Sequence, residues 1–160
     1  MKAVIGIGTN MGDKVQNIED AVEALNLIPN INVIRKASIY ETDPWGYTEQ
    51  DVFYNTVVEV ETTVSPEILL GACLGIEAGM GRVRVFKNGP RVIDLDLLVY
   101  EGFSSNTEHL TLPHKYIGER DFVLIPLKEL YDDMNVLGIS YKNQYKAILK
   151  TGTARKIEKS

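Results

Sequence analysis

The order of short apolar segments along the chain constrains its fold most strongly. Four segments rich in apolar and β-branched residues are expected to be strands: 2–7, 31–41, 53–63 and 92–100. Two segments with helical periodicity or helix-start signals, about 13–27 and 66–78, separate them. The order βαββαβ predicts an α+β fold with a ferredoxin-like core and an antiparallel sheet. Extra C-terminal helices are expected near 120–131 and 140–150.

Size and composition favour one ordinary domain spanning 1–160, and a monomer is expected. The chain has 160 residues, 44% of them hydrophobic and 24% charged. A net charge of −5 argues against nucleic acid and anionic membranes as partners, since both favour a basic surplus. No apolar run of about 18 residues is present to span a membrane, and no signal peptide is evident, so a cytoplasmic location is expected. The lone Cys73 lies in an apolar run and is interpreted as core.

The most informative stretch for chemistry is GPRVIDLDLLVY, residues 89–100. Side chains alternate faces on a strand, so Asp94 and Asp96 point one way while Ile93, Leu95 and Leu97 point into the core. Two neighbouring carboxylates repel each other unless a cation lies between them, and Mg²⁺ prefers such oxygen ligands together with phosphate oxygens. The alternative is a strand with a solvated acidic face.

Basic side chains flank this pair on both sides in the sequence. Those upstream are Arg82, Arg84, Lys87 and Arg91, and those downstream are His114, Lys115 and Arg120. Cations beside paired acids favour a phosphate–metal site, where they would neutralise phosphate oxygens. A solvated basic loop is the alternative for the upstream group, and a structural role is the alternative for His114.

Two common phosphate-binding motifs are excluded. The start VIGIGTNMG imitates a dinucleotide fingerprint, but its third glycine is Gly12 rather than position 11, which is Met11. No G-x-x-x-x-G-K-[ST] sequence occurs, so a P-loop is absent. A metal-dependent nuclease or nucleotidyltransferase remains an alternative, as does a regulatory module without catalysis.

Together these segments resemble the 6-hydroxymethyl-7,8-dihydropterin pyrophosphokinase family. GPRVIDLDLLVY matches the family signature G-P-R-x-x-D-[LIV]-D, and GIGTNMGD, ETDPWG, FYNTVVEVET, LTLPH and RDFVLIPL follow the family's order over about residues 2–130. The resemblance implies transfer of pyrophosphate from ATP to the hydroxymethyl group of the reduced pterin in folate biosynthesis, giving AMP. Asn88, Lys115 and Leu74 depart from residues that some members carry.

The resemblance also assigns roles by position. It implies that Asp94 and Asp96 hold two Mg²⁺ ions and that Arg82 and Arg91 stabilise the transition state. Its ATP-binding residues would be Glu77, Arg82, Arg84, Arg91, His109, Thr111, His114, Lys115 and Arg120. Its pterin-binding residues would be Thr42, Asp43, Trp45, Phe53, Asn55 and Phe122, with the pterin between the two phenylalanines. Loops 42–51 and 79–91 are predicted to close over ATP.

Overall fold

An antiparallel sheet forms the centre of the molecule, as the sequence predicts. The computed structural model describes residues 1–43, 51–81 and 92–157. The sheet strands there are β1 (Lys2–Thr9), β2 (Ile31–Lys36), β3 (Tyr40–Thr42), β4 (Phe53–Thr62), β5 (Asp94–Tyr100) and β10 (Arg155–Lys156). Their order is β10-β3-β4-β1-β5, with β2 also paired to β4, and every pairing is antiparallel. This order confirms the α+β, ferredoxin-like prediction.

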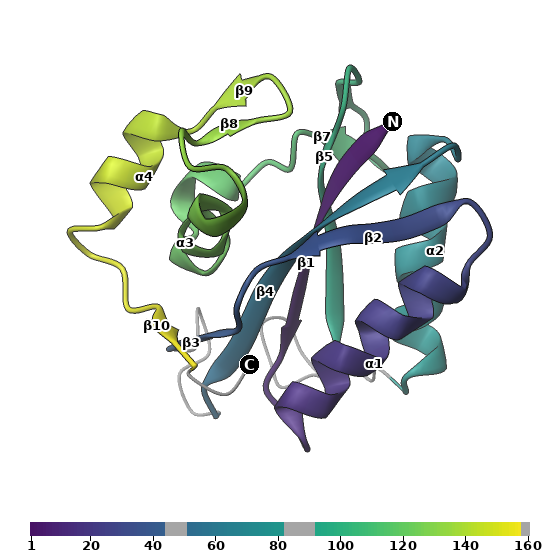
Figure 1. Ribbon diagram of the computed structural model, residues 1–160, viewed down its shortest axis with the longest axis horizontal. Coiled ribbons are helices and arrows are strands. Elements are labelled where there is room, and N and C mark those ends of the chain that lie inside the picture. Colours follow the sequence, from purple (N-terminus) through teal and green to yellow (C-terminus); the bar gives the residue numbers. More distant parts are fainter. Residues whose placement is uncertain (44–50, 82–91, 158–160) are drawn as a thin grey trace.

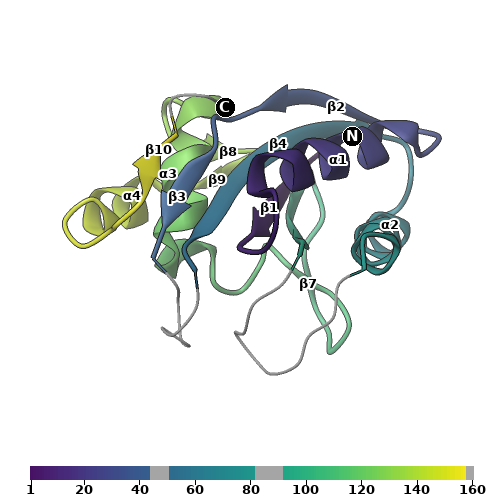
Figure 2. The ribbon, with the colours of Figure 1, turned by 90° about the horizontal axis from the view of Figure 1, so that it is seen from below.

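Helices cover both faces of the sheet (Figures 1 and 2). The helical elements are α1 (Lys14–Leu27), α2 (Pro66–Gly79), η1 (Ile117–Glu119), α3 (Asp121–Leu130) and α4 (Lys142–Ile148). Two small hairpins complete the described part, β6 (Ser105–Asn106) with β7 (Thr111–Leu112) and β8 (Asn135–Val136) with β9 (Ile139–Ser140). Helices α1 and α2 bury one core against the sheet, and α3 buries a second core against the other face.

Local sequence signals begin the first two helices. The Asp13 carboxylate accepts a hydrogen bond from Gln16 N at 3.2 Å and caps α1. Ser65 caps α2 by accepting from Ile68 N, and Pro66 occupies the first turn, where its missing N–H costs nothing. Both starts agree with the sequence prediction.

The predicted single strand over 31–41 is wrong in one respect, because the chain leaves the ladder between β2 and β3. Ser38 N donates to the Glu129 carboxylate of α3 at 2.6 Å rather than to β4. Thr56 Oγ1 of β4 donates to Ala37 O at 2.8 Å and fixes the start of the break. A side chain from a distant helix therefore divides one predicted strand into two.

In the sequence of β4, apolar Val58 and Val60 alternate with polar Glu59 and Glu61, which predicts a half-buried strand with Glu59 on the polar face. Instead Glu59 is only 2% exposed, because α3 covers that face. Its carboxylate pairs with Arg35 Nη2 of β2 at 2.7 Å and accepts a hydrogen bond from the Tyr131 hydroxyl at the end of α3. Burial by itself raises the pKa of Glu59, but the hydrogen bonds from Arg35 and Tyr131 outweigh it and leave the pKa below 4.5.

Helices in the described ranges are all too short or too polar to cross a membrane.

Replacing Glu59 by Gln should lower the free energy of unfolding at pH 7 by about 2 kcal/mol, since a buried charge pair is broken but Arg35 is 43% exposed and stays hydrated. Because the pKa of Glu59 is lower in the folded protein than in the unfolded chain, the ionised carboxylate stabilises the fold above pH 4.5. This stabilisation is lost as the pH falls through the pKa that Glu59 has in the folded protein. Urea unfolding at pH 3 to 7 measures it. The difference in free energy of unfolding between wild type and Glu59→Gln should become smaller as the pH is lowered. The control Glu61→Gln, at an exposed position of the same strand, should have little effect on this free energy at any pH. A difference between wild type and Glu59→Gln that stays the same from pH 3 to 7 would contradict this account.

Candidate active site

Two glycines on the central strand β1 set the floor of the site. Gly8 pairs with Asn55 of β4 on one side and with Asp94 of β5 on the other, while Gly6 pairs with Asp96. Directly paired residues in an antiparallel sheet share a face, so Asn55, Asp94 and Asp96 lie on the same face. Because neither glycine has a side chain, the Asn55 amide and the Leu98 side chain lie directly against the backbone of β1 on that face.

At Gly8 a side chain is excluded by contact. A Cβ there would lie 2.6 Å from Asn55 Oδ1, closer than any real contact of this kind. The Asn55 amide is also held from its other end, because its Nδ2 donates to Thr42 Oγ1 at 3.0 Å in the interior. The backbone of β1 and the Thr42 hydroxyl together fix the orientation of this amide.

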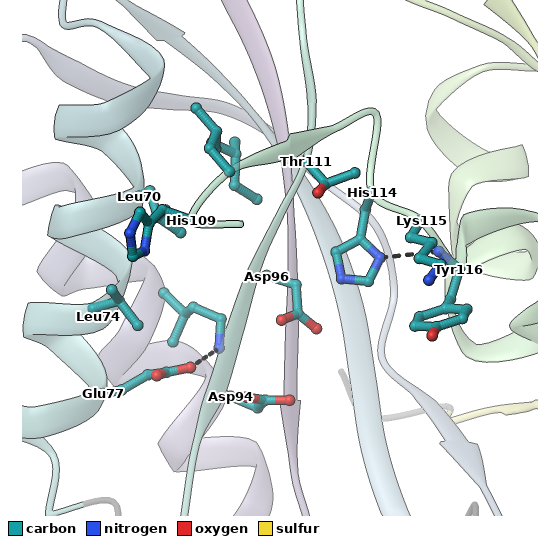
Figure 3. A pocket seen from close by; sticks show the side chains of 13 residues that line it. Leu70, Leu74, Glu77, Asp94, Asp96, His109, Thr111, His114, Lys115 and Tyr116 are labelled. Carbon is teal, nitrogen blue, oxygen red and sulfur yellow. Dashed lines mark hydrogen bonds between the residues drawn. The ribbon is translucent and has the colours of Figure 1, made fainter. Parts of the chain in front are cut away.

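A cavity of about 390 Å³ lies beside the two aspartates, between α2 and the segment 109–116 (Figure 3). Its polar lining consists of Glu77, Asp94, Asp96, His109, Thr111, His114, Lys115 and Tyr116, and its apolar lining of Leu70, Leu74, Leu95, Leu97 and Leu110. Asp94 and Asp96 point from the same side of β5, as the alternation predicted. Seven of the predicted nucleotide and metal residues thus line one cavity, although they come from three separate parts of the chain.

Glu77 fastens α2 to the strand that carries the aspartates. Its Oε2 accepts a hydrogen bond from Leu95 N at 2.7 Å, and the side chain is buried. The neighbouring Cys73 is buried as predicted; burial and then the negative charges of Glu77 and Asp96 raise the pKa of its thiol to about 12. The cysteine is therefore an uncharged core residue beside an acidic wall.

His114 presents one ring nitrogen that can donate. Its Nδ1 accepts a hydrogen bond from Tyr116 N at 3.3 Å, which leaves the proton of the neutral ring on Nε2. Burial and the charge of Arg120 lower the pKa of His114 below 6.5, against an opposing effect of Asp94. At neutral pH the ring is therefore an uncharged donor.

Arg120 stands just before α3 and links the cavity to that helix. Its Nη1 lies 3.9 Å from Asp96 Oδ2, and its guanidinium lies 5.3 Å from the ring centres of both Tyr116 and Phe122. Two aromatic rings and a carboxylate thus restrict the guanidinium beside the acidic pair.

Of the predicted pterin residues that the structure describes, Thr42, Phe53 and Asn55 lie on strands, Asp43 directly follows β3 and Phe122 lies on α3. Phe53 shares its face of β4 with Asn55, as predicted, and Thr42 contacts Asn55 from β3. Asp43 is exposed and pairs with Arg155 Nη2 at 3.3 Å, while Phe122 is half-buried in the first turn of α3. The stacking of a pterin between Phe53 and Phe122 stays a prediction.

Four predicted site residues, Trp45, Arg82, Arg84 and Arg91, lie outside the described residues, as does Asn88. Their roles remain predictions.

Sequence reasoning missed the glycines of β1 and the aliphatic wall of the cavity. Gly6 and Gly8 recur with the strand period of two, which is the available signal, but the predicted strand, the excluded dinucleotide motif and the family landmark GIGTNMGD assign these glycines no role in the site. Leu70 and Leu110 could not be distinguished from core leucines without knowing which helix face meets the segment 109–116.

Comparison with known proteins decides the family. The profile of the family described as 7,8-dihydro-6-hydroxymethylpterin-pyrophosphokinase (HPPK) matches residues 4–132. A protein of Methylorubrum extorquens named 2-amino-4-hydroxy-6-hydroxymethyldihydropteridine pyrophosphokinase is 43% identical over 154 residues, which are 96% of this chain and 98% of that protein. The Bacillus subtilis protein of the same name is 41% identical over 128 residues, 80% of this chain and 77% of that one.

The chain belongs to this family. The resemblance read from the sequence is confirmed, and with it the enzyme class, an ATP-dependent pyrophosphokinase that generally requires Mg²⁺. Among solved structures, the chain is similar to Plasmodium falciparum HPPK-DHPS with pteroate, with a TM-score of 0.68 and 18% sequence identity. The match covers 93% of this pyrophosphokinase but only 42% of the solved chain, and at this identity it supports the fold alone.

Replacing Gly8 by Ala should lower the free energy of unfolding by about 1–3 kcal/mol and weaken turnover, because the added Cβ displaces the anchored Asn55 amide. The matched control is Gly75→Ala at an exposed position of α2, where a Cβ meets no atom within 4 Å and helix propensity should add about 0.5–1 kcal/mol. Urea unfolding and steady-state kinetics measure both variants. A Gly8→Ala protein as stable and active as wild type would contradict the proposed role of the floor.

Proposed function

We propose that the cavity beside Asp94 and Asp96 binds ATP, and that the sheet face around Asn55 binds 6-hydroxymethyl-7,8-dihydropterin, so that pyrophosphate passes between them to give AMP and the pterin diphosphate. The observation that carries the proposal is the register of β1, which sets Asn55 and Asp94 on the two sides of Gly8. Donor and acceptor sites are then adjacent on one sheet face.

We assign Asp94 and Asp96 as the ligands of two Mg²⁺ ions. The pair fits this role because Mg²⁺ favours one or two carboxylates together with phosphate oxygens. No cluster of three or more metal-binding side chains occurs in the described parts of the chain, which agrees with a metal that arrives with its nucleotide. When bound, magnesium neutralises charge on the triphosphate.

The neutral His114 and the cations around the acidic pair would contact the phosphates. His114 offers its Nε2–H, Lys115 lines the cavity, and the Arg120 guanidinium is held beside Asp96. Arg82, Arg84 and Arg91 are proposed to join them, with Arg82 and Arg91 stabilising the transition state as in the family pattern. Glu77, His109 and Thr111 are proposed to form the nucleotide pocket, where Leu70, Leu74 and Leu110 supply an apolar wall suited to a base.

The pterin would be bound by shape and by its polar edge. Asn55 is buried with its amide fixed by Thr42, so little freedom is lost when it hydrogen-bonds a heterocycle. Phe53 shares that face and Phe122 lies beside Arg120, which suits stacking on a flat ring. Asp43 and Trp45 are proposed to complete this site from the adjoining loop.

In this arrangement the protein positions two substrates and supplies no nucleophile. The pterin hydroxyl attacks the β-phosphorus in line, the bond from that phosphorus to the α-phosphate oxygen breaks, and AMP leaves. Fixed cations and dipoles meet the charge that develops, so orientation and electrostatics provide the acceleration. We assign no general base. We further propose one domain over 1–160, a monomer and a cytoplasmic location.

Replacing Asp94 or Asp96 by Asn should reduce AMP formation by about two to three orders of magnitude, because a charged metal ligand is lost while shape is kept. Rates are measured with ATP, Mg²⁺ and the dihydropterin. The exposed change Glu23→Gln on α1 gives the same change in net charge and should keep wild-type rates. Undiminished activity in either aspartate variant would refute the assignment. Equal loss in Glu23→Gln would show that net charge, not the site, is responsible.

A further inference from the structure

The C-terminal segment 152–157 contacts both β3 and α3, two elements that carry residues assigned to the pterin. It lies beyond residues 4–132, the part of the chain that the family profile matches. In Figures 1 and 2 it returns from α4 to the outer edge of β3. There Arg155 pairs with Glu41 and Lys156 with Tyr40, and Ile157 N donates to Ile39 O at 2.8 Å. The segment thus adds a strand next to Thr42.

The same segment contacts the start of α3. The Asp121 carboxylate accepts hydrogen bonds from Thr153 N at 2.6 Å and Ala154 N at 3.1 Å. Asp121 stands between Arg120, assigned to the phosphates, and Phe122, assigned to the pterin. A carboxylate that accepts two backbone N–H groups is a strong anchor, since charge-assisted hydrogen bonds are about twice as strong as neutral ones.

Close packing shows that this contact requires a small residue in the segment. A Cβ at Gly152 would lie 3.0 Å from Asp121 Cβ and 2.9 Å from Ile148 O. The absence of a side chain lets the backbone approach Asp121 closely enough for the following N–H groups to reach its carboxylate.

Four side-chain contacts further connect this region. Arg155 reaches Glu41 Oε2 and Asp43 Oδ1, each at 3.3 Å, on either side of Thr42. Lys156 Nζ lies 3.6 Å from Glu129 Oε1 of α3, and the Tyr40 hydroxyl of β3 donates to the same carboxylate at 2.8 Å. The exposed ion pairs contribute little singly. With the backbone bonds they connect β3, β10 and α3 at several points.

We propose that residues 152–157 form a strap that sets the distance between the β3–β4 wall of the pterin site, with Thr42 and Asn55, and the α3 wall, with Phe122. This inference rests on the proposed pterin site. The strap residues touch no substrate, so they are positioning residues. The β5 side of the cavity, assigned to ATP, has its own attachment through Glu77 and Leu95 N and does not depend on the strap.

The contact between the strap and α3 can be weakened by a substitution on either side of it. Asp121→Ala removes the acceptor on α3, and Gly152→Val forces the segment away from the same carboxylate. Each should raise the KM for the dihydropterin about tenfold while the KM for ATP changes less than about twofold, because Arg120 keeps its own contacts with Asp96 and Tyr116. Asp121→Asn keeps an acceptor oxygen and should restore most of the pterin affinity. Asp20→Ala, which removes an exposed carboxylate from α1, should match wild type.

Steady-state kinetics with each substrate varied in turn, together with thermal unfolding, test the strap. Selective loss of pterin affinity in both loosened variants, with recovery in Asp121→Asn, is the expected result. A wild-type pterin KM in folded Asp121→Ala and Gly152→Val, or an equal rise in both KM values, would overturn the strap and leave the proposed function standing. A wild-type protein that forms no AMP with the pterin would overturn both.

Discussion

The register between β1 and its two neighbours is the constraint on which the site depends. Gly8 lies between Asn55 and Asp94, and Gly6 pairs with Asp96, so side chains on strands far apart in sequence share one face of the sheet. Register in a sheet with both faces buried is strongly specified, because a slip of one residue would turn every side chain to the other face. Ile5 and Ile7 on the opposite face of β1 are fully packed against α1 and α2, so the core that stabilises the fold also fixes the register of the site.

A second set of contacts places α3 on the site face. Glu59 holds the end of this helix through Tyr131, and Glu129 binds Ser38 N and the Tyr40 hydroxyl. These polar contacts bridge a helix to strands that also carry site residues. Burying a carboxylate costs stability, but these contacts define the position of the helix. The helix in turn presents Arg120 beside Asp96 at its first turn.

Much of the fold and part of the site could be predicted from the sequence, because those features are local. The facing of Asp94 and Asp96 follows from strand geometry, and the helix starts at Asp13 and Ser65 follow from capping. The burial of Glu59 could not be predicted, since it requires Tyr131, 72 residues away. The break between β2 and β3 depends on Glu129, and β10 is two residues long with a partner more than a hundred residues away. The pterin residues came from family resemblance, because Phe53 and Phe122 look like core residues until α3 is placed.

The identity of the products of the wild-type protein tests the central claim most directly. Phosphorus NMR of a reaction with ATP, Mg²⁺ and 6-hydroxymethyl-7,8-dihydropterin follows every phosphate at once. The account predicts AMP and a pterin diphosphate in equal amounts, with neither forming when the pterin is omitted. Formation of ADP with a pterin monophosphate would contradict it, because attack would then be at the γ-phosphorus and not at the β-phosphorus as proposed.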